Sequence, residues 1–109
     1  MNNFFYKILF LINWKKKIFP IIIQNFLNKK ILTLAWLNKF SFIESFWYKK
    51  TCYWSRKKRY FWRKGFFSNN IQIIIKIKFD CDLDSFIYLI NYLNKNCHYN
   101  LFKCFNYIL

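Results

Sequence analysis

Short apolar runs separated by lysine and asparagine make up much of the chain, and their lengths predict strands more often than helices. Two such runs, Ile18–Gln24 and Ile31–Leu37, are divided by Lys29–Lys30. Pro20 lies in the first run and suits an edge strand or the start of a strand. We therefore expect one strand in each run.

A helical pattern follows the second run. Asn38 is a residue type that caps helix N-termini, so we expect a helix over about Lys39–Lys49. Phe40, Ile43 and Trp47 recur at helical spacing on one face of this segment. Such a stripe is typical of a helix face that packs on the core, and the prediction is that these three side chains are buried.

Strand patterns return in the second half of the chain. Thr51–Arg56 and Arg59–Arg63 predict two short strands or a hairpin with Lys57–Lys58 near its tip. Gly65–Asn70 contains the sole glycine and predicts a loop. Ser85–Tyr92 predicts a further strand.

Ile71–Phe79 gives the clearest strand pattern, because isoleucine and phenylalanine occupy its odd-numbered positions. Successive side chains point to opposite faces of a strand. We therefore expect the odd-numbered residues to face the core, and Gln72 and the lysines to face solvent. Ile74 is the exception to this alternation.

Length and composition bound the class of protein. The 109 residues suffice for one domain, residues 1–109, with a small core. The net charge of +15 normally suggests a polyanionic partner. The abundant Lys, Asn, Ile and Phe have AT-rich codons, however, so base-composition drift in an AT-biased genome explains the charge without nucleic acid. The alternative is a basic RNA-binding or ribosomal accessory protein that uses the cations and aromatics of Tyr53–Lys64.

The apolar runs also bear on the compartment. Met1–Trp14 carries Lys7 within its apolar stretch and has no small-residue cleavage site, so it does not resemble a secretory signal. The runs are also shorter than the roughly 20 residues of a membrane-spanning helix. We expect a cytoplasmic protein without a membrane partner, in a reducing compartment where cysteines bind metal or react.

The candidate chemistry begins with an acidic cluster, since three of the four acidic residues lie within Asp80–Asp84. Crowded carboxylates repel one another unless a cation lies between them, and Mg²⁺ prefers such oxygen ligands. If the preceding strand continues, Asp80, Asp82 and Asp84 extend its polar face and Cys81 extends its apolar face, so one cation could not easily take both. The alternative is a polar strand end solvated by neighbouring lysines.

The thiols form a second cluster of candidates. Cys81, Cys97 and Cys104 offer three soft ligands, which would leave the fourth position of a tetrahedral zinc open. Three buried free cysteines are the alternative, because no C-x₂-C pair is present. His98 could be a fourth ligand, a proton shuttle or a surface imidazole. For Cys52 we expect a buried thiol.

Five segments together form an ordered set of motifs. They are Ile31–Asn38 (I-L-T-L-A-W-L-N), Tyr53–Arg56 (Y-W-S-R), Phe61–Gly65 (F-W-R-K-G), Asp80–Asp84 (D-C-D-L-D), and Cys97–His98 with Cys104–Phe105. In order and spacing they resemble V-L-M-L-A-W-M-N, F-W-S-R, L-W-R-K-G, D-C-D-G-D and C-H-T-G-x-x-S-C-F of the phosphoribosyl-AMP cyclohydrolase family of histidine biosynthesis. The resemblance spans about residues 18–105 and leaves residues 1–17 as an N-terminal extension.

The resemblance implies an α+β, mainly β fold: a small mixed, folded, pseudobarrel-like sheet of about five strands with one or two short helices, in a homodimer. It implies Mg²⁺ at the three aspartates of Asp80–Asp84. It implies Zn²⁺ at Cys81, Cys97 and Cys104, with ligands from both subunits. The implied reaction is zinc-dependent hydrolysis of the N1–C6 bond of the adenine ring of phosphoribosyl-AMP, in a single domain without a fused second enzyme.

For this reaction we expect His98 to relay a proton toward N1. We expect Arg56, Arg63 and Lys64 to contact the two phosphate-bearing ends of the substrate. Several loop residues depart from the family pattern and bear on phosphate affinity and rate; they are Lys57, Lys58, Phe66, Asn69, Tyr99, Asn100 and Lys103. A further alternative is therefore a decayed enzyme kept as a metal-bound structural dimer.

Overall fold

The computed structural model describes residues 3–65, 71–92 and 108, and these residues form a mainly β fold with two helices. In chain order the elements are α1 (Asn3–Leu11), η1 (Trp14–Lys16), β1 (Phe19–Asn25), β2 (Ile31–Leu37), α2 (Lys39–Tyr48), β3 (Cys52–Ser55), β4 (Tyr60–Arg63), β5 (Gln72–Phe79) and β6 (Phe86–Tyr92). The predicted α+β class is confirmed, with six strands in the described residues where we expected about five. Neither of these helices has the length and apolarity needed to cross a membrane.

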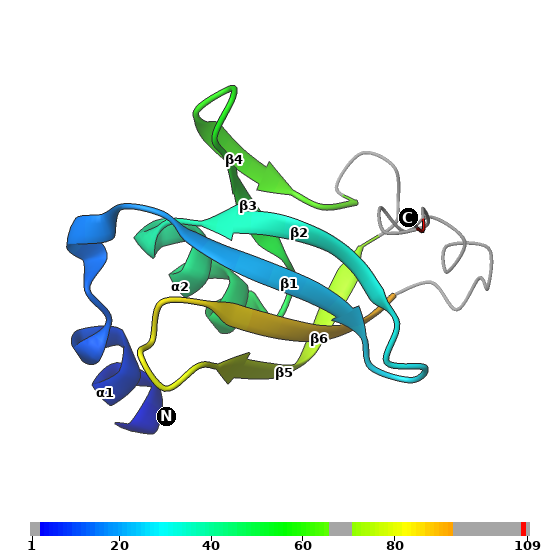
Figure 1. Cartoon of the computed structure of the whole chain (residues 1–109), viewed down its shortest axis with the longest axis horizontal. Helices are drawn as coiled ribbons and strands as arrows, with labels where there is room; N and C mark the ends of the chain where they lie inside the picture. The colour runs from blue at the N-terminus through cyan, green and yellow to red at the C-terminus, as the bar shows by residue number, and fades with distance from the viewer. Residues whose placement is uncertain (1–2, 66–70, 93–107, 109) are drawn as a thin grey trace.

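The main sheet is mixed and has the strand order β2-β1-β6-β5. β1 pairs antiparallel with β2 and parallel with β6, while β5 and β6 are antiparallel. β3 and β4 form a separate two-stranded hairpin, drawn in green in Figure 1. The entry to β1, the start of α2 and the β5–β6 turn consequently lie at one end of the main sheet (Figure 1).

The N-terminal helix α1 contributes to the core. Phe5, Ile8 and Ile12 are buried members of the main hydrophobic cluster. The Phe5 ring stacks on Phe46 of α2 with 3.7 Å between ring centroids, and lies 5.9 Å from Phe42. The predicted N-terminal extension therefore packs on the domain that it precedes.

Helix α2 begins as predicted but buries a different face. The Asn38 side chain accepts a hydrogen bond from the Ser41 N–H at 2.9 Å, which is the expected N-cap. The predicted burial of Phe40 and Trp47 is wrong, because these side chains are 69% and 53% exposed. Ser41, Phe42 and Ser45 form the buried side instead, since small hydroxyl side chains let the helix approach a neighbouring backbone.

Buried polar groups attach the β3–β4 hairpin to the rest of the fold. The Ser45 hydroxyl donates to the Cys52 carbonyl and accepts from the Cys52 N–H, both at 3.0 Å. Gln72 of β5 accepts hydrogen bonds from the hydroxyls of Thr51, at 2.9 Å, and Tyr53, at 2.6 Å. The expectation that Gln72 faces solvent is therefore wrong, as its residual exposure is 3%. Satisfied polar groups of this kind can be buried without a large free-energy cost.

The alternation predicted along β5 fails at its centre. The register with β6 shifts between Ile74 and Lys76, which places a β-bulge at Ile75. A bulge inserts one residue and so exchanges the two faces of the strand. Ile74 is buried whereas Ile75 is 44% exposed, and Ile77 packs against the core beyond the bulge.

Candidate functional site

The acidic motif lies in the turn between β5 and β6. The Asp80 N–H donates to the Ser85 carbonyl at 3.2 Å, and the Leu83 N–H donates to the Asp80 carbonyl at 3.1 Å. The strand therefore does not continue through the motif, and the condition under which the carboxylates and Cys81 would lie on opposite faces is not met. The difference matters because alternate residues of a strand lie about 7 Å apart, whereas a turn gathers their side chains.

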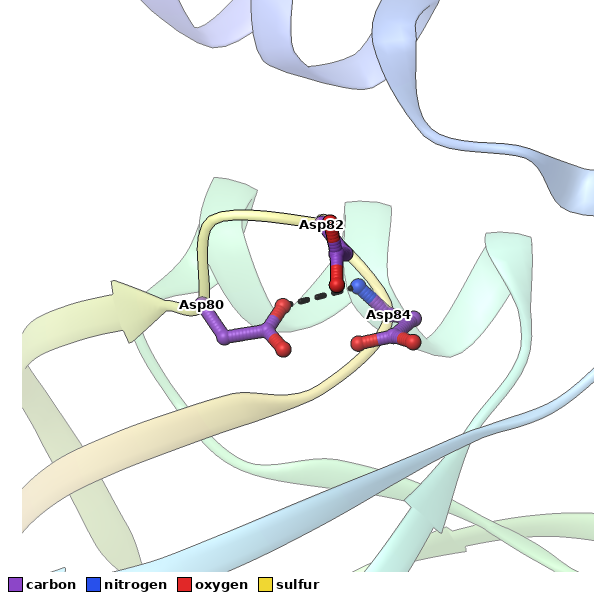
Figure 2. A group of neighbouring side chains, drawn as sticks. All are labelled: Asp80, Asp82 and Asp84. Atoms are coloured by element: carbon purple, nitrogen blue, oxygen red, sulfur yellow. Dashed lines mark hydrogen bonds between the residues drawn. The ribbon is translucent and has the colours of Figure 1, made fainter.

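The three carboxylates converge on the inside of this turn. Figure 2 shows the side chains of Asp80, Asp82 and Asp84 directed toward one another, and one oxygen from each lies within 4.8 Å of the others. Asp80 accepts a hydrogen bond from the Asp84 N–H at 3.1 Å. This hydrogen bond is the main reason that the pKa of Asp80 lies below its ordinary value. The turn thus favours the ionised form of Asp80.

This donor set fits a hard divalent cation. Mg²⁺ binds oxygen at about 2.1 Å, so two of its ligands lie between about 3 and 4.2 Å apart. Because one oxygen of each carboxylate lies within 4.8 Å of the other two, a small closure of the exposed turn would satisfy these distances. Lys16 of η1 places its Nζ 3.6 Å from Oδ2 of Asp84, so one carboxylate already contacts a cation.

The soft ligands can be located only in part. Cys81 is an exposed free thiol in the same turn. Cys97, His98 and Cys104 lie outside the described residues, so the zinc site formed with Cys81 stays a prediction. Cys52 is a buried free thiol, as expected, and burial is the main reason that its pKa rises to about 12.

Leu83 occupies the position at which the related motif has glycine. Its φ of 57° lies in the left-handed region, which costs a residue with a Cβ about 1 kcal/mol. The Leu83 side chain packs against the hydrophobic core, and this contact offsets part of the backbone cost. Leucine is therefore accommodated at this position of the turn despite its positive φ.

Arg63, one of the three predicted phosphate contacts, is engaged by Glu44 of α2. Its Nε and Nη2 donate to the two Glu44 carboxylate oxygens at 2.6 and 2.7 Å. This bidentate pair raises the pKa of Arg63 and holds the pKa of Glu44 below its ordinary value. The sequence did not lead us to predict a role for Glu44. It is the one acidic residue outside the Asp80–Asp84 motif, and this could have indicated a partner for a cation.

The other two predicted phosphate contacts lie on the hairpin beside aromatic rings. The Arg56 guanidinium is 4.1 Å from the ring centroid of Trp36, and the Lys64 ammonium is 5.3 Å from that of Trp62. Trp62 is 48% exposed, while Trp54 is half-buried. Arg56 and Arg63 line different pockets, so the structure does not join them in one site.

Taken together, these features define a small α+β domain that carries a candidate divalent-cation site, with a free thiol beside it, at one end of a mixed sheet. The family model for phosphoribosyl-AMP cyclohydrolase matches residues 33–106. The chain belongs to this family.

Curated relatives match over most of the chain. Phosphoribosyl-AMP cyclohydrolase from Hydrogenovibrio crunogenus is 37% identical over 86 residues, which are 79% of this chain and 58% of the relative. The proteins of the same name from Chloroherpeton thalassium and Archaeoglobus fulgidus are 35% and 33% identical over 91 residues, or 84% of this chain. The chain spans 65% of the first of these two and 84% of the second.

Proposed function

We propose that this chain hydrolyses the N1–C6 bond of the adenine ring of phosphoribosyl-AMP, a step of histidine biosynthesis. The observation that carries the proposal is the Asp80–Asp84 turn, where three converging carboxylates and an exposed thiol lie together. A chain with only four acidic residues places three of them in this turn. Relatives that bear the name of this enzyme and match most of the chain support the same activity.

We propose two metal ions as cofactors. Mg²⁺ would be held by the carboxylates of Asp80, Asp82 and Asp84, whose oxygens converge to within 4.8 Å and would close slightly around it. Zn²⁺ would be held by Cys81 together with Cys97 and Cys104, of which Cys81 supplies an accessible thiol. When bound, such a zinc ion lowers the pKa of a water ligand to about 7.

The chain's own residues would then position the substrate and move a proton. In the net reaction the water oxygen bonds to C6, the N1–C6 bond breaks and N1 gains a proton. His98 is the proposed carrier of that proton. Arg56 and Lys64 are the proposed phosphate contacts, and Arg63 joins them only where the substrate displaces Glu44.

We propose a cytoplasmic homodimer in which both subunits supply zinc ligands. The exposed thiol of Cys81 on a surface turn can be reached by ligands of a second subunit. β5 is an edge strand of the described sheet and exposes Ile75 and Phe79, which a partner would cover. The two described cysteines are free thiols, as a reducing compartment maintains them.

The decisive experiment gives the purified protein phosphoribosyl-AMP with Zn²⁺ and Mg²⁺ and follows ring opening by ultraviolet absorbance. We expect turnover that a chelator abolishes and zinc restores. Cys97→Ser should lose both zinc and activity, whereas the matched control Cys52→Ser should retain both. A folded, zinc-loaded protein without turnover would contradict the proposal and favour a decayed, structural dimer.

A further inference from the structure

We propose that a pocket between the N-terminal segment and the β3–β4 hairpin binds the phosphate group of a phosphomonoester. The pocket has a volume of about 520 Å³, and four of its seven lining residues are cations. We call it the basic pocket and define it by these four residues: Lys16, Lys17, Arg56 and Arg59. None of the seven lining residues is acidic, so a bound anion would not meet a like charge inside it.

The distribution of arginine distinguishes this pocket from the generally basic surface. The chain has 19 Lys+Arg, of which only Arg56, Arg59 and Arg63 are arginines. Two of these three line the basic pocket, and the third makes the bidentate pair with Glu44. Arginine differs from lysine in presenting a planar fork of donors that matches carboxylate and phosphate oxygens. In this lysine-rich chain, one arginine therefore binds a carboxylate and the other two line a pocket in which they could bind a phosphate.

Two residues of the basic pocket, Lys17 and Arg59, have an unusual backbone conformation, which they share with Lys29 and Lys49 outside the pocket. Lys17 and Arg59 have φ values of 68° and 56°, in the left-handed region where glycine and asparagine cost least. Strained residues of this kind persist where the surroundings or a function require them. Both positions nevertheless carry long cationic side chains that line one pocket.

Two contacts restrict the part of the hairpin that carries Arg56 and Arg59. The Arg56 guanidinium lies over the Trp36 ring of β2 at 4.1 Å, and the hairpin turn is closed by the Arg59 N–H donating to the Ser55 carbonyl at 2.8 Å. A site whose donors are held before binding loses less conformational entropy when the ligand arrives. The basic pocket is thus partly preorganised for an anion.

The basic pocket adjoins the acidic turn. Lys16 lines the pocket and also contacts Asp84 at 3.6 Å. The assignment of the bound phosphate to the substrate rests on the proposed function, because phosphoribosyl-AMP carries phosphate at both ends. On that assignment, one phosphate end would dock beside the turn that holds the three carboxylates.

Nuclear magnetic resonance of the three arginine Nε–Hε groups tests the pocket directly. Ribose 5-phosphate, added at physiological salt, should shift the signals of Arg56 and Arg59 in a saturable manner. Ribose without phosphate should not shift them. The signal of Arg63 is an internal control and should stay in place, because Glu44 occupies its donors. No shift, or an equal shift at all three arginines, would overturn the proposal.

Single variants test the contribution of individual cations. Arg59→Gln should raise the dissociation constant for ribose 5-phosphate by about tenfold, since it removes a charged guanidinium. Lys17→Gln should raise this dissociation constant several-fold. Lys29→Gln is a matched control, because Lys29 also has a positive φ, of 62°, but lies in the β1–β2 turn at the opposite end of the sheet. Equal losses in Lys29→Gln and Lys17→Gln would contradict a local site.

Turnover separates this inference from the proposed function. If wild-type protein binds ribose 5-phosphate at Arg56 and Arg59 but does not open the ring, the basic pocket stands and the proposed activity fails. If turnover occurs and Arg59→Gln leaves KM unchanged, the assignment of the pocket to the substrate fails. A short single-stranded RNA that shifts the same signals at a lower concentration than ribose 5-phosphate would overturn the phosphomonoester class.

Discussion

Two regions of the molecule hold the four acidic residues, and they use them in opposite ways. At the junction of α2 and β4, Glu44 is neutralised by a bidentate pair with Arg63. In the β5–β6 turn, three carboxylates converge and the contact with Lys16 is a single longer one, 3.6 Å from Asp84. The junction thus joins two elements through balanced charges, whereas the turn retains an excess of negative charge that a cation can neutralise.

The largest expected difference between the two regions is in thiol reactivity, because each contains one cysteine. Cys52 beside Glu44 has a pKa of about 12, so at pH 8 roughly one molecule in ten thousand carries the reactive thiolate. Cys81 is exposed in the turn. In metal-free protein, a chromogenic thiol reagent should show a fast phase that Cys81→Ser diminishes and Cys52→Ser does not. A fast phase lost in Cys52→Ser would contradict the burial of that thiol.

Magnesium binding is the next largest expected effect. Asp82→Asn removes one of three charged ligands and should weaken Mg²⁺ binding by about tenfold or more, as measured by calorimetry. Glu44→Gln is the matched control, because it removes a carboxylate that lies outside the turn and should leave Mg²⁺ affinity unchanged. Equal losses in both variants would show that general charge, rather than the turn, determines the affinity.

The Glu44–Arg63 pair should contribute modestly to stability. The pair is partly exposed, and surface ion pairs stabilise by about 0.2–1 kcal/mol in double-mutant cycles. Because the pair is bidentate, we expect a coupling energy of about 1 kcal/mol, the upper end of that range. The cycle of Glu44→Gln, Arg63→Gln and the double variant in urea unfolding measures it. A coupling energy near zero would mean that the ion pair does not help to attach the hairpin.

Leu83 offers a smaller test of the turn's backbone. Glycine adopts positive φ without the cost that a Cβ imposes, so Leu83→Gly should be about 1 kcal/mol more stable than Leu83→Ala. Leu27 in the β1–β2 turn is the control; it is not among the described residues with positive φ, and there alanine should be the more stable. The comparison uses midpoints of urea unfolding. Equal stability of the two Leu83 variants would contradict a positive φ in solution.

The smallest expected effect is on the pH dependence of stability. The pKa values of Asp80 and Glu44 both lie below their ordinary values of 3.8 and 4.5. The unfolded state therefore binds protons first on acidification, and the stability from these groups is full above about pH 4.5 and lost as the pH falls through their folded pKa values. Asp80→Asn and Glu44→Gln should each make the unfolding free energy depend less on pH between pH 5.5 and about 3. A steeper pH dependence of stability in either variant would contradict the direction of these pKa shifts.

Local patterns predicted the elements whose formation depends on neighbouring residues. The bounds of β2 were predicted from the apolar run Ile31–Leu37, and the start of α2 from Asn38, because capping and strand alternation act over a few residues. The β3–β4 hairpin likewise formed around Lys57–Lys58. The acidic residues of the candidate site were also recognised from the motif itself.

Contacts between distant segments decided what those patterns could not. The buried face of α2 depends on Ser45 bonding the backbone of Cys52, so periodicity alone chose the wrong side chains. Gln72 is buried because Thr51 and Tyr53 donate to it across about twenty residues of sequence.

The sequence by itself determined the fold class, most of the strands and the identity of the three carboxylates, because alternation, capping and motif spacing depend on residues that are close in sequence. Only the tertiary structure decided that these carboxylates converge in a turn, that Arg63 is occupied by Glu44, and that residues before β1 line a pocket with the hairpin. These features depend on which segments meet when the sheet closes over its core, and a burial preference for each residue does not specify its partner.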